Sequence, residues 1–345
     1  MTDLACRLHA AHDLRIEDAP AVQPDRGDVV VRVLRGGICG SDLHYYHDGG
    51  FGPIRVREPI ILGHEAAGMV EQAPEGSGLT QGQLVALSPS RPCAECAFCR
   101  QGMERHCLNM RFNGSAMRVP HEQGLFRSRI AHPAAQCIPL PHGATAAAAA
   151  GAEPLAVCLH ALSHAPDLAG ARVLVTGAGP IGAICVALAR LRGAAEIVAT
   201  DVQDFTLAIS RRMGADHAIN VATAPDGLAD WQGGKGRFDV VLECSANPQA
   251  IAQAITVLRP QGTLVQIGVA GTVPLPLNLI VSKEIRMVGT HRFDREYAEA
   301  VALIGSGRID LSPMVTDVLP AADAVRAFDL ASDRSRAVKV QLDFT

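Results

Sequence analysis

Residues 172–182 read Arg-Val-Leu-Val-Thr-Gly177-Ala-Gly179-Pro180-Ile181-Gly182. A short strand-like apolar run leads into a glycine-rich turn, and a helical run follows to about Leu191. A second apolar run then ends in Asp201, about twenty positions beyond the last glycine. Glycines alone punctuate many turns, but strand, turn, helix and acidic residue in this order predict a dinucleotide-binding site.

Each glycine of this turn has a physical role in that prediction. Gly177 permits the tight turn, Gly179 lets a pyrophosphate approach the backbone, and Gly182 allows close packing of helix on strand. Asp201 would accept hydrogen bonds from the ribose hydroxyls and repel a 2′-phosphate, which favours NAD over NADP. The alternative is that the glycines serve only a turn. The predicted cofactor-binding residues are Gly177, Gly179, Pro180, Ile181, Gly182 and Asp201.

Strand and helix signals alternate from about residue 154 to 288, which indicates a parallel, doubly wound (Rossmann) sheet. Residues 1 to about 150 differ, because they are rich in Gly and Pro and carry short alternating apolar runs such as 29–34, typical of strands joined by loops. The predicted fold class is therefore α/β with a separate β-rich domain. The strands predicted in the α/β part are 172–176, 196–200, 238–243, 263–267 and 285–288.

Four cysteines fall within fifteen residues, in a lobe at about 90–110. They predict a closed tetrahedral zinc site, because four thiolates are soft ligands and leave no coordination position open. The alternative is a cluster of disulfides. The N-terminus has no apolar signal-peptide core, so we expect a reducing cytoplasmic setting, which favours the metal. The predicted ligands are Cys93, Cys96, Cys99 and Cys107.

Length and charge set limits on the function. A chain of 345 residues is too long for one core and predicts two domains. The formal net charge of −4, without a basic run or basic-aromatic pattern, gives no sign of nucleic-acid binding. The most apolar stretch, 144–162, is interrupted by polar residues and is not a membrane span.

Three short segments supply the ligands for a second, catalytic zinc with one open position. They are 36–44, which holds Cys39, then 63–68, which holds His64 and Glu65, and 152–156, which holds Glu153. Each segment alone is a weak signal, and the carboxylates need not all touch the metal at once. One of Glu65 and Glu153 could bind the metal directly while the other holds metal-bound water.

At this point the chain resembles the zinc-dependent medium-chain dehydrogenase/reductase family over essentially its full length. The Gly-His-Glu segment, the four-cysteine lobe and the dinucleotide fingerprint occur in the family's order. Residues 39–44 and 153–155 look like the polyol (sorbitol-type) branch, in which a glutamate stands where alcohol dehydrogenases have a cysteine ligand. Residues 110–117 and 291–293 are similar to L-idonate 5-dehydrogenases, whereas Leu125 departs from the expected second glycine.

The resemblance implies a GroES-like catalytic domain over 1–153, a Rossmann domain over 154–288, and a return of 289–345 to the catalytic domain. It also implies an active site in the cleft, a homodimer or homotetramer, and hydride transfer to the nicotinamide from a hydroxyl polarised by zinc. Ser41 would accept the hydroxyl proton and His44 would continue the relay through the cofactor ribose. The alternatives are that Ser41 caps a helix beginning near Asp42 and that His44 is a plain surface residue.

The expected substrate is a sugar acid, L-idonate oxidised to 5-keto-D-gluconate, and a cation should hold its carboxylate. Arg292 is the first candidate, and Arg111 and Arg118 lie in the other idonate-like segment; each could equally be a solvated surface residue. A neutral polyol such as sorbitol or xylitol, which needs no cation, is the second expectation. An inactive homologue with a structural or regulatory role is the third.

Overall fold

The computed structural model describes residues 3–345 and separates into two compact units. Unit 1 comprises the chain up to Glu153, Asp294–Asp333 and Lys339–Thr345, and unit 2 comprises Pro154–Phe293 and Arg334–Val338. The family resemblance predicts that all of 289–345 belongs to the catalytic part, whereas 289–293 and 334–338 lie in unit 2. The second segment is held there by Arg334, whose Nη2 lies 2.7 Å from Asp201 Oδ2.

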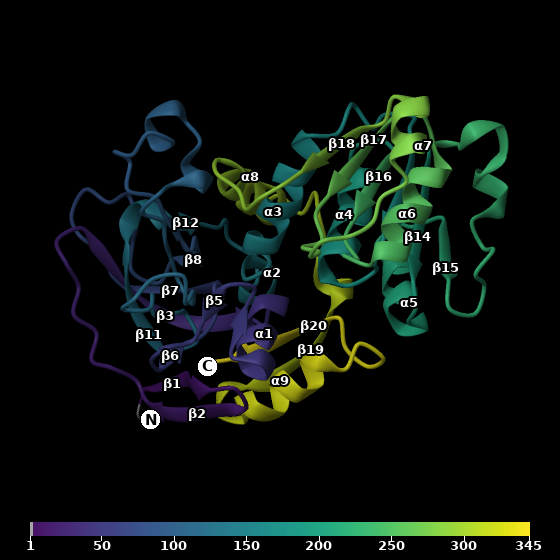
Figure 1. Ribbon diagram of the computed structural model, residues 1–345. Coiled ribbons are helices and arrows are strands. Elements are labelled where there is room, and N and C mark those ends of the chain that lie inside the picture. Colours follow the sequence, from purple (N-terminus) through teal and green to yellow (C-terminus); the bar gives the residue numbers. More distant parts are fainter. Residues whose placement is uncertain (1–2) are drawn as a thin grey trace. The chain divides into compact units, whose positions relative to one another are not determined.

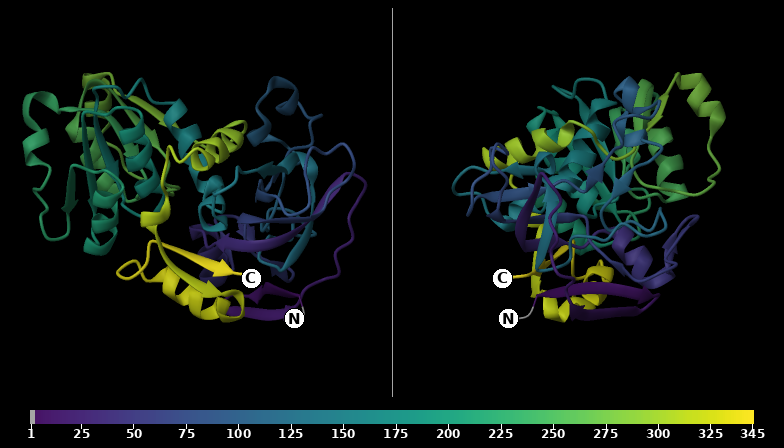
Figure 2. Two further views of the ribbon diagram at one scale, coloured as in Figure 1. Left: turned by 180° about the vertical axis from the view of Figure 1, so that it is seen from behind. Right: turned by 90° about the vertical axis from the view of Figure 1, so that its left-hand side faces the viewer.

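Unit 2 contains a six-stranded parallel sheet in the order β15-β14-β13-β16-β17-β18. The strand order reverses direction between β13 and β16, so the right-handed crossovers place α4 and α6 on opposite faces. The strands are β13 (Arg172–Thr176), β14 (Glu196–Asp201), β15 (His217–Asn220), β16 (Phe238–Glu243), β17 (Leu258–Gln266) and β18 (Arg286–Gly289). The helices are α4 (Pro180–Leu191), α5 (Asp204–Arg212), α6 (Pro248–Val257) and α7 (Leu277–Lys283), and they flank the sheet in Figures 1 and 2.

The predicted doubly wound sheet is confirmed, and its strands fall where the apolar runs are. Both faces of the sheet are covered, so its strands carry near-continuous apolar runs such as 173–175, fully buried. Strand β17 is longer than the predicted 263–267, because Leu258 already pairs with Phe238 before the ladder resumes at Thr263. Phe238, Val241, Ile255 and Leu264 belong to the core on one side.

Unit 1 is a β-rich assembly with few helices. One sheet has the order β2-β1-β6, and a larger one has the order β12-β8-β7-β3-β20-β19, with β11 also paired to β3. Its elements are β1 (Leu4–Ala10), β2 (Asp13–Asp18), β3 (Asp28–Gly37), α1 (Gly40–Asp48), β4 (Gly50–Phe51), β5 (Ile54–Arg55), β6 (Ile60–Ile61), β7 (Glu65–Gln72), β8 (Leu84–Leu87), β9 (Ser90–Arg91), β10 (Arg111–Phe112), β11 (Arg129–Pro133), β12 (Cys137–Pro139), α2 (Ala146–Ala149), α8 (Glu296–Gly305), β19 (Val315–Pro320), α9 (Ala324–Ser332) and β20 (Lys339–Asp343). Helix α3 (Ala152–Ser163) contains the boundary between the units.

Strand β3 is the central strand of unit 1. It pairs with β7 on one edge, and on the other edge with β11 in its first half and β20 in its second half. The C-terminal strand therefore lies beside segments from the start of the chain, as the yellow and purple ribbons of Figure 1 show. At Gly37, strand β3 is paired with Glu65 on one side and Gln341 on the other, so three distant segments meet at one point.

Among residues 3–345 there is no helix with both the length and the apolar character needed to span a membrane.

Candidate active site and metal centres

The four predicted cysteines of the lobe come together in unit 1. Their sulfur atoms all lie within 4.8 Å of one another, and Cys96 Sγ and Cys99 Sγ are 3.5 Å apart. Two short 3-10 turns, Cys99–Gln101 and Glu104–His106, fold the loop back so that Cys107 reaches the first three. The alternative of a disulfide cluster is not what the structure shows, because every cysteine is a free thiol.

The chemistry of this donor set fits zinc. Four sulfurs around a tetrahedral zinc at about 2.3 Å are separated from one another by about 3.8 Å, close to the spacing found here. Backbone N–H groups already point at the sulfurs: that of Cys93 lies 3.2 Å from Cys107 Sγ, and that of Leu108 lies 3.5 Å from Cys96 Sγ. Backbone hydrogen bonds, from Cys99 first and then Leu108, lower the pKa of Cys96 to about 6, which favours the thiolate that a metal requires.

Cys96→Ser is expected to lower stability and soluble yield and to remove one zinc per chain, because three thiolates hold the ion far less tightly than four. Zinc content by elemental analysis and the thermal midpoint of unfolding check this. Cys137→Ser is the matched control, since Cys137 is buried in the core of unit 1 and away from the four sulfurs. A variant that keeps the wild-type zinc content would contradict the assignment of these four residues.

A second group of ligand atoms lies elsewhere in unit 1. Cys39, His64 and Glu65 place one ligand atom each within 4.8 Å of one another. Cys39 is the N-cap of α1, His64 directly precedes β7, and Glu65 is the first residue of that strand. His64 and Glu65 are both buried, whereas Cys39 is half-buried. Thiol, imidazole and carboxylate together suit a zinc ion that keeps a position open for substrate.

Asp42 lies beside this group of three, although it was not among the predicted site residues. It is fully buried on α1, where its Oδ2 accepts the backbone N–H of Cys39 and its Oδ1 lies 3.7 Å from His64 Nδ1. Burial alone would lower the pKa of His64, but Asp42 and Cys39 together raise it well above its usual value. Asp42 therefore orients both ligands, as an outer carboxylate commonly does for a metal-bound histidine.

Lys339 is the second residue that the sequence analysis missed. It is the first residue of β20, it is buried, and its Nζ donates to both carboxylate oxygens of Glu65 at 2.8 Å and to the carbonyl of Ile38 at 3.0 Å. Gly37 leaves the room for this contact, since a Cβ there would lie 2.2 Å from Glu65 Oε2. Glu65 thus faces a cation as well as the two other candidate ligands.

The remaining predicted residues of this region differ in their surroundings. Glu153 is buried in the first turn of α3 and lies near enough to His64 to raise its pKa, but it is not within the group of three. Ser41 lies in the first turn of α1, and its hydroxyl forms no hydrogen bond with any residue between 3 and 345. The alternative that Ser41 caps this helix is wrong, because the N-cap is Cys39. His44 is exposed, with its ring 4.9 Å from that of Phe51 and Nδ1 3.1 Å from Asp48 Oδ2.

The glycine turn of unit 2 has the geometry that the sequence predicted. It connects β13 to α4, which begins at Pro180 and ends at Leu191. A Cβ on Gly182 would lie 1.8 Å from the carbonyl oxygen of Gly177, so only glycine allows helix and turn to pack this closely. Pro180 and Ile181 form the first turn of α4; Pro180 has no N–H to leave unpaired there, and the remaining free N–H groups of such a helix start favour a phosphate.

Comparisons with known proteins agree with both units. Residues 25–142 match the alcohol dehydrogenase GroES-like domain, and residues 180–306 match the zinc-binding dehydrogenase family. The chain is 40% identical to the L-idonate 5-dehydrogenase (NAD(P)(+)) of Escherichia coli K12 over 316 residues, 91% of each protein. It is 34% identical to the sorbitol dehydrogenase of Gallus gallus over 347 residues, 99% of this chain and 96% of that one. The crystal structure of L-idonate 5-dehydrogenase from Escherichia coli superposes with a TM-score of 0.92 at 37% identity, covering 99% of this chain and 98% of that one.

The chain is a zinc-binding dehydrogenase. The two clusters described above are accordingly the places where its own residues fit zinc, and the glycine turn is where they fit a nicotinamide dinucleotide. The family is named for alcohol dehydrogenases, and the names of the two relatives add a sugar acid and a polyol to the substrates of its members.

The predicted ribose ligand of this dehydrogenase has a partner that the sequence analysis did not foresee. Asp201 is buried at the end of β14, where its Oδ1 accepts the N–H of Val202 and its Oδ2 that of Ala178. Oδ2 also pairs with Arg334 Nη2, and this guanidinium lies 3.8 Å from the position a Cβ on Gly179 would take. The charge of Asp201 is therefore partly neutralised at the place where it was expected to repel a 2′-phosphate.

The arginines proposed for the substrate carboxylate have distinct settings. Arg111 Nε lies 2.6 Å from Glu122 Oε1, and its neighbour in β10, Phe112, is the residue whose ring faces His64 at 5.7 Å. Because successive side chains of a strand point to opposite faces, Arg111 points away from the metal cluster. Arg118 donates to a backbone carbonyl, and Arg292 lies in unit 2 in a left-handed conformation (φ 52°).

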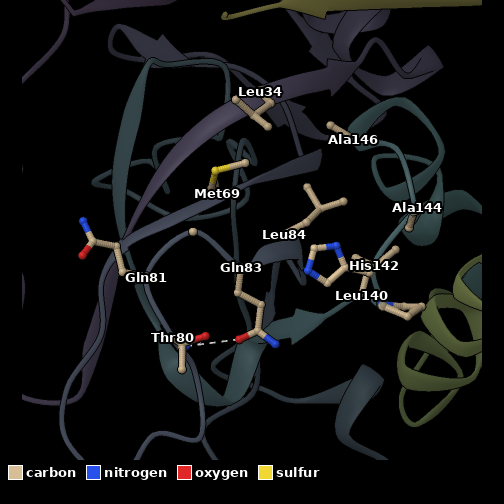
Figure 3. A pocket seen from close by; sticks show the side chains of 13 residues that line it. Leu34, Met69, Thr80, Gln81, Gln83, Leu84, Leu140, His142, Ala144 and Ala146 are labelled. Atoms are coloured by element: carbon tan, nitrogen blue, oxygen red, sulfur yellow. Dashed lines mark hydrogen bonds between the residues drawn. The ribbon is translucent and has the colours of Figure 1, made fainter.

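A cavity of about 620 Å³ in unit 1 does not belong to this site (Figure 3). It lies between β8 and the segment 140–146, and His142 is the single titratable side chain among its lining residues. Thr80 and Gln83 close one side through a hydrogen bond of 3.2 Å. None of the candidate metal ligands lines it.

Proposed function

We propose that this dehydrogenase oxidises a secondary hydroxyl of a sugar acid, with L-idonate at its C5 hydroxyl as the substrate and NAD as the preferred acceptor. The observation that carries the proposal is the identity of 40%, over 91% of both chains, with a relative named L-idonate 5-dehydrogenase (NAD(P)(+)). The group Cys39, His64 and Glu65, with Glu153 near His64, supports it by offering the mixed thiol, imidazole and carboxylate set that such a reaction uses.

Zinc at this group would polarise the substrate hydroxyl as a Lewis acid, and the nicotinamide would accept the hydride. Side chains of this protein position the candidate ligands and carry the proton. Asp42 and Lys339 hold His64 and Glu65 in place through contacts of 3.7 Å and 2.8 Å. Ser41 accepts the proton of the substrate hydroxyl at its Oγ, and His44 passes the proton on toward solvent. His44 suits that step because its ring is half exposed.

Ser41→Ala is expected to slow alcohol oxidation by about two orders of magnitude at neutral pH, the usual scale of general acid–base help. The hydroxyl does not cap α1, so the helix should survive the change. Steady-state turnover, with cofactor binding measured in parallel by fluorescence, checks this. Ser306→Ala is the control, since Ser306 lies exposed at the end of α8. Near-native turnover of the Ser41 variant would rule out the relay.

Arg334→Ala is expected to raise the ratio of catalytic efficiencies with NAD and NADP by about three- to fivefold, because Asp201 would lose an exposed partner that moderates its charge. Asp201→Ala should weaken the binding of NAD and lower the same ratio of efficiencies. Kinetics with both cofactors, and binding of 2′,5′-ADP against 5′-AMP by calorimetry, check both. If Arg334→Ala leaves the ratio and the binding unchanged, Arg334 has no part in cofactor choice.

A general polyol dehydrogenase is the second candidate function. The pairing of Arg111 with Glu122 favours it, because one of the three arginines considered for the substrate carboxylate already has a carboxylate partner. The identity of 34% with a sorbitol dehydrogenase over 99% of this chain agrees with it. A neutral polyol would need no cation at all.

A panel of L-idonate, other sugar acids, sorbitol and xylitol, followed by NADH formation, tests the two candidates. If a cation holds the carboxylate, the wild type should use idonate at least about thirtyfold more efficiently than a neutral polyol. Arg292→Ala should shrink that ratio by harming the acid substrate. Arg259→Ala is the matched control. Arg259 pairs with Asp239 at the N-terminal ends of β17 and β16, whereas Arg292 follows the C-terminal end of β18. Equal use of sorbitol and idonate would overturn the sugar-acid proposal.

Assembly into a homodimer or homotetramer stays a prediction of the resemblance. Light scattering coupled to size-exclusion chromatography measures it directly.

A further inference from the structure

A cavity of about 320 Å³ in unit 1 is lined by three arginines, Arg91, Arg111 and Arg127. They come from β9, β10 and the extended segment before β11, where Arg127 forms an isolated β-bridge with Ala5. None of the candidate metal ligands lines this cavity, and Arg111, its one residue considered for the substrate carboxylate, points away from the metal cluster. Its volume is at the lower end of the range for small-molecule sites.

One carboxylate serves two of these arginines. Glu122 Oε1 lies 2.6 Å from Arg111 Nε, and Glu122 Oε2 lies 3.2 Å from Arg91 Nη2. Both oxygens of Glu122 are therefore engaged, and no second acidic residue is among the lining residues. Three guanidinium groups thus face a single negative charge.

Arg127 has no counter-ion within residues 3–345. Its Nε is buried without a hydrogen-bond partner, and the side chain makes no ion pair there. Burial, with the like charges of Arg7 and Arg91, lowers the pKa of Arg127 to about 10. Arg7 cannot neutralise the charge of Arg127, because it is itself a cation and pairs with Glu17. A half-buried guanidinium with no counter-ion and a buried, unpaired Nε is costly, and a bound anion would compensate it.

The other polar groups of the cavity add no charge. His132 is buried, and burial together with Arg91 and Arg127 lowers its pKa to about 4, so the ring is neutral at pH 7. His121 uses both ring nitrogens, Nε2 accepting from the N–H of Arg57 and Nδ1 bonding the carbonyl of Arg118. The lining therefore keeps an excess of two positive charges from its three arginines and one glutamate.

We propose that this cavity is a binding site for a phosphate dianion, free or as the phosphoryl group of a small metabolite. Two excess positive charges match a dianion rather than a single carboxylate, and guanidinium groups suit phosphate because their paired N–H donors fit its oxygens. The site is independent of the proposed dehydrogenase reaction, so it can be tested without the substrate.

Calorimetry and thermal unfolding of the full-length protein test the proposal, with inorganic phosphate, glucose 6-phosphate and gluconate as probes against chloride at equal ionic strength. Phosphate should bind and raise the unfolding midpoint, and gluconate should do so more weakly. A phosphate monoester that binds more tightly than inorganic phosphate would identify a metabolite as the source, and the reverse order would identify free phosphate.

Arg127→Met should weaken phosphate binding by about tenfold or more, since it removes a charge-assisted contact. It should also raise the unfolding midpoint in chloride, because the uncompensated charge is gone. Arg127→Lys, which keeps the charge and the fold, should bind phosphate more weakly than the wild type. Arg129→Gln is the matched control two residues away, since Arg129 pairs with Asp3 and Glu71 and should keep the phosphate response.

Two results would overturn the proposal. One is a wild-type midpoint that phosphate does not raise beyond chloride, or an Arg127→Met variant that responds as the wild type does. The other is an Arg127→Met variant that changes the oligomeric state, which would assign the cavity to a carboxylate of a second copy of the chain.

Discussion

His64→Ala is expected to abolish turnover while both units stay folded. The imidazole supplies one of three ligand atoms that lie within 4.8 Å of one another. Removing it leaves a thiol and a carboxylate that cannot hold zinc in place for catalysis. Lewis-acid activation contributes several kcal/mol to such reactions, so the loss should be about a thousandfold or more in kcat/KM. The fold should survive because the replaced ring makes one aromatic contact, with Phe112, and His64 lies just before β7 rather than within it.

The measurement combines NADH formation with zinc content and cofactor binding. His64→Ala should lose one zinc and keep the other, because the four-cysteine lobe is a separate cluster. Binding of NAD should be retained, since the glycine turn lies in unit 2. His217→Ala is the control, because that histidine is half exposed on β15 and far in sequence from the ligands. Substantial turnover in a variant lacking that zinc would mean that the group of three is not the catalytic centre.

The elements that sequence predicts well are those whose signal is local. The strand, glycine turn and helix of 172–191 are decided by neighbouring residues, and the structure has β13 and α4 at those positions. The four-cysteine lobe is likewise local, since all four sulfurs come from fifteen residues. The prediction that Glu65 joins Cys39 and His64 rested on their residue types as zinc ligands, because no periodicity brings α1 beside β7.

The residues that sequence reasoning missed are the counter-charges. Lys339 meets Glu65 across 274 positions, and Arg334 meets Asp201 across 133, so only the fold reveals either pair. Asp42 was accessible in principle, since a carboxylate three residues after Cys39 is a capping signal for α1. Its second role, facing His64, depends on how Gly63 lies against α1, where the backbone N–H of that glycine also donates to Asp42.

Lys339→Met is expected to destabilise unit 1 strongly while it leaves every candidate metal ligand intact. The ammonium group is buried, with a side-chain exposure of 3%, and all three of its hydrogen bonds go to Glu65 and Ile38. Removing it leaves the Glu65 carboxylate buried without its cation, which typically costs about 3–5 kcal/mol in the free energy of unfolding. Urea unfolding of the zinc-free protein should show this loss as a lower midpoint.

A double variant separates the unpaired charge from lost packing. Lys339→Met combined with Glu65→Leu removes both charges, and replacing a buried pair by apolar groups is often nearly neutral, so most of the lost stability should return. Arg35→Ala is the control, because Arg35 pairs with Asp343 of the same strand β20 but is partly exposed, and it should cost about 1 kcal/mol or less. A double variant no more stable than Lys339→Met alone would show that the charge of Glu65 is not the cause.

Measuring the Lys339→Met variant with and without zinc also tests which of Glu65 and Glu153 binds the metal directly. If Glu65 ligates the metal directly, zinc supplies the positive charge that Lys339→Met removed, and the loss of stability should shrink markedly in the zinc-loaded protein. If Glu153 is the direct ligand and Glu65 only faces Lys339, the loss should be the same with and without zinc. The difference between the two urea midpoints therefore tells which carboxylate binds, while His64 and Cys39 remain unchanged in both measurements.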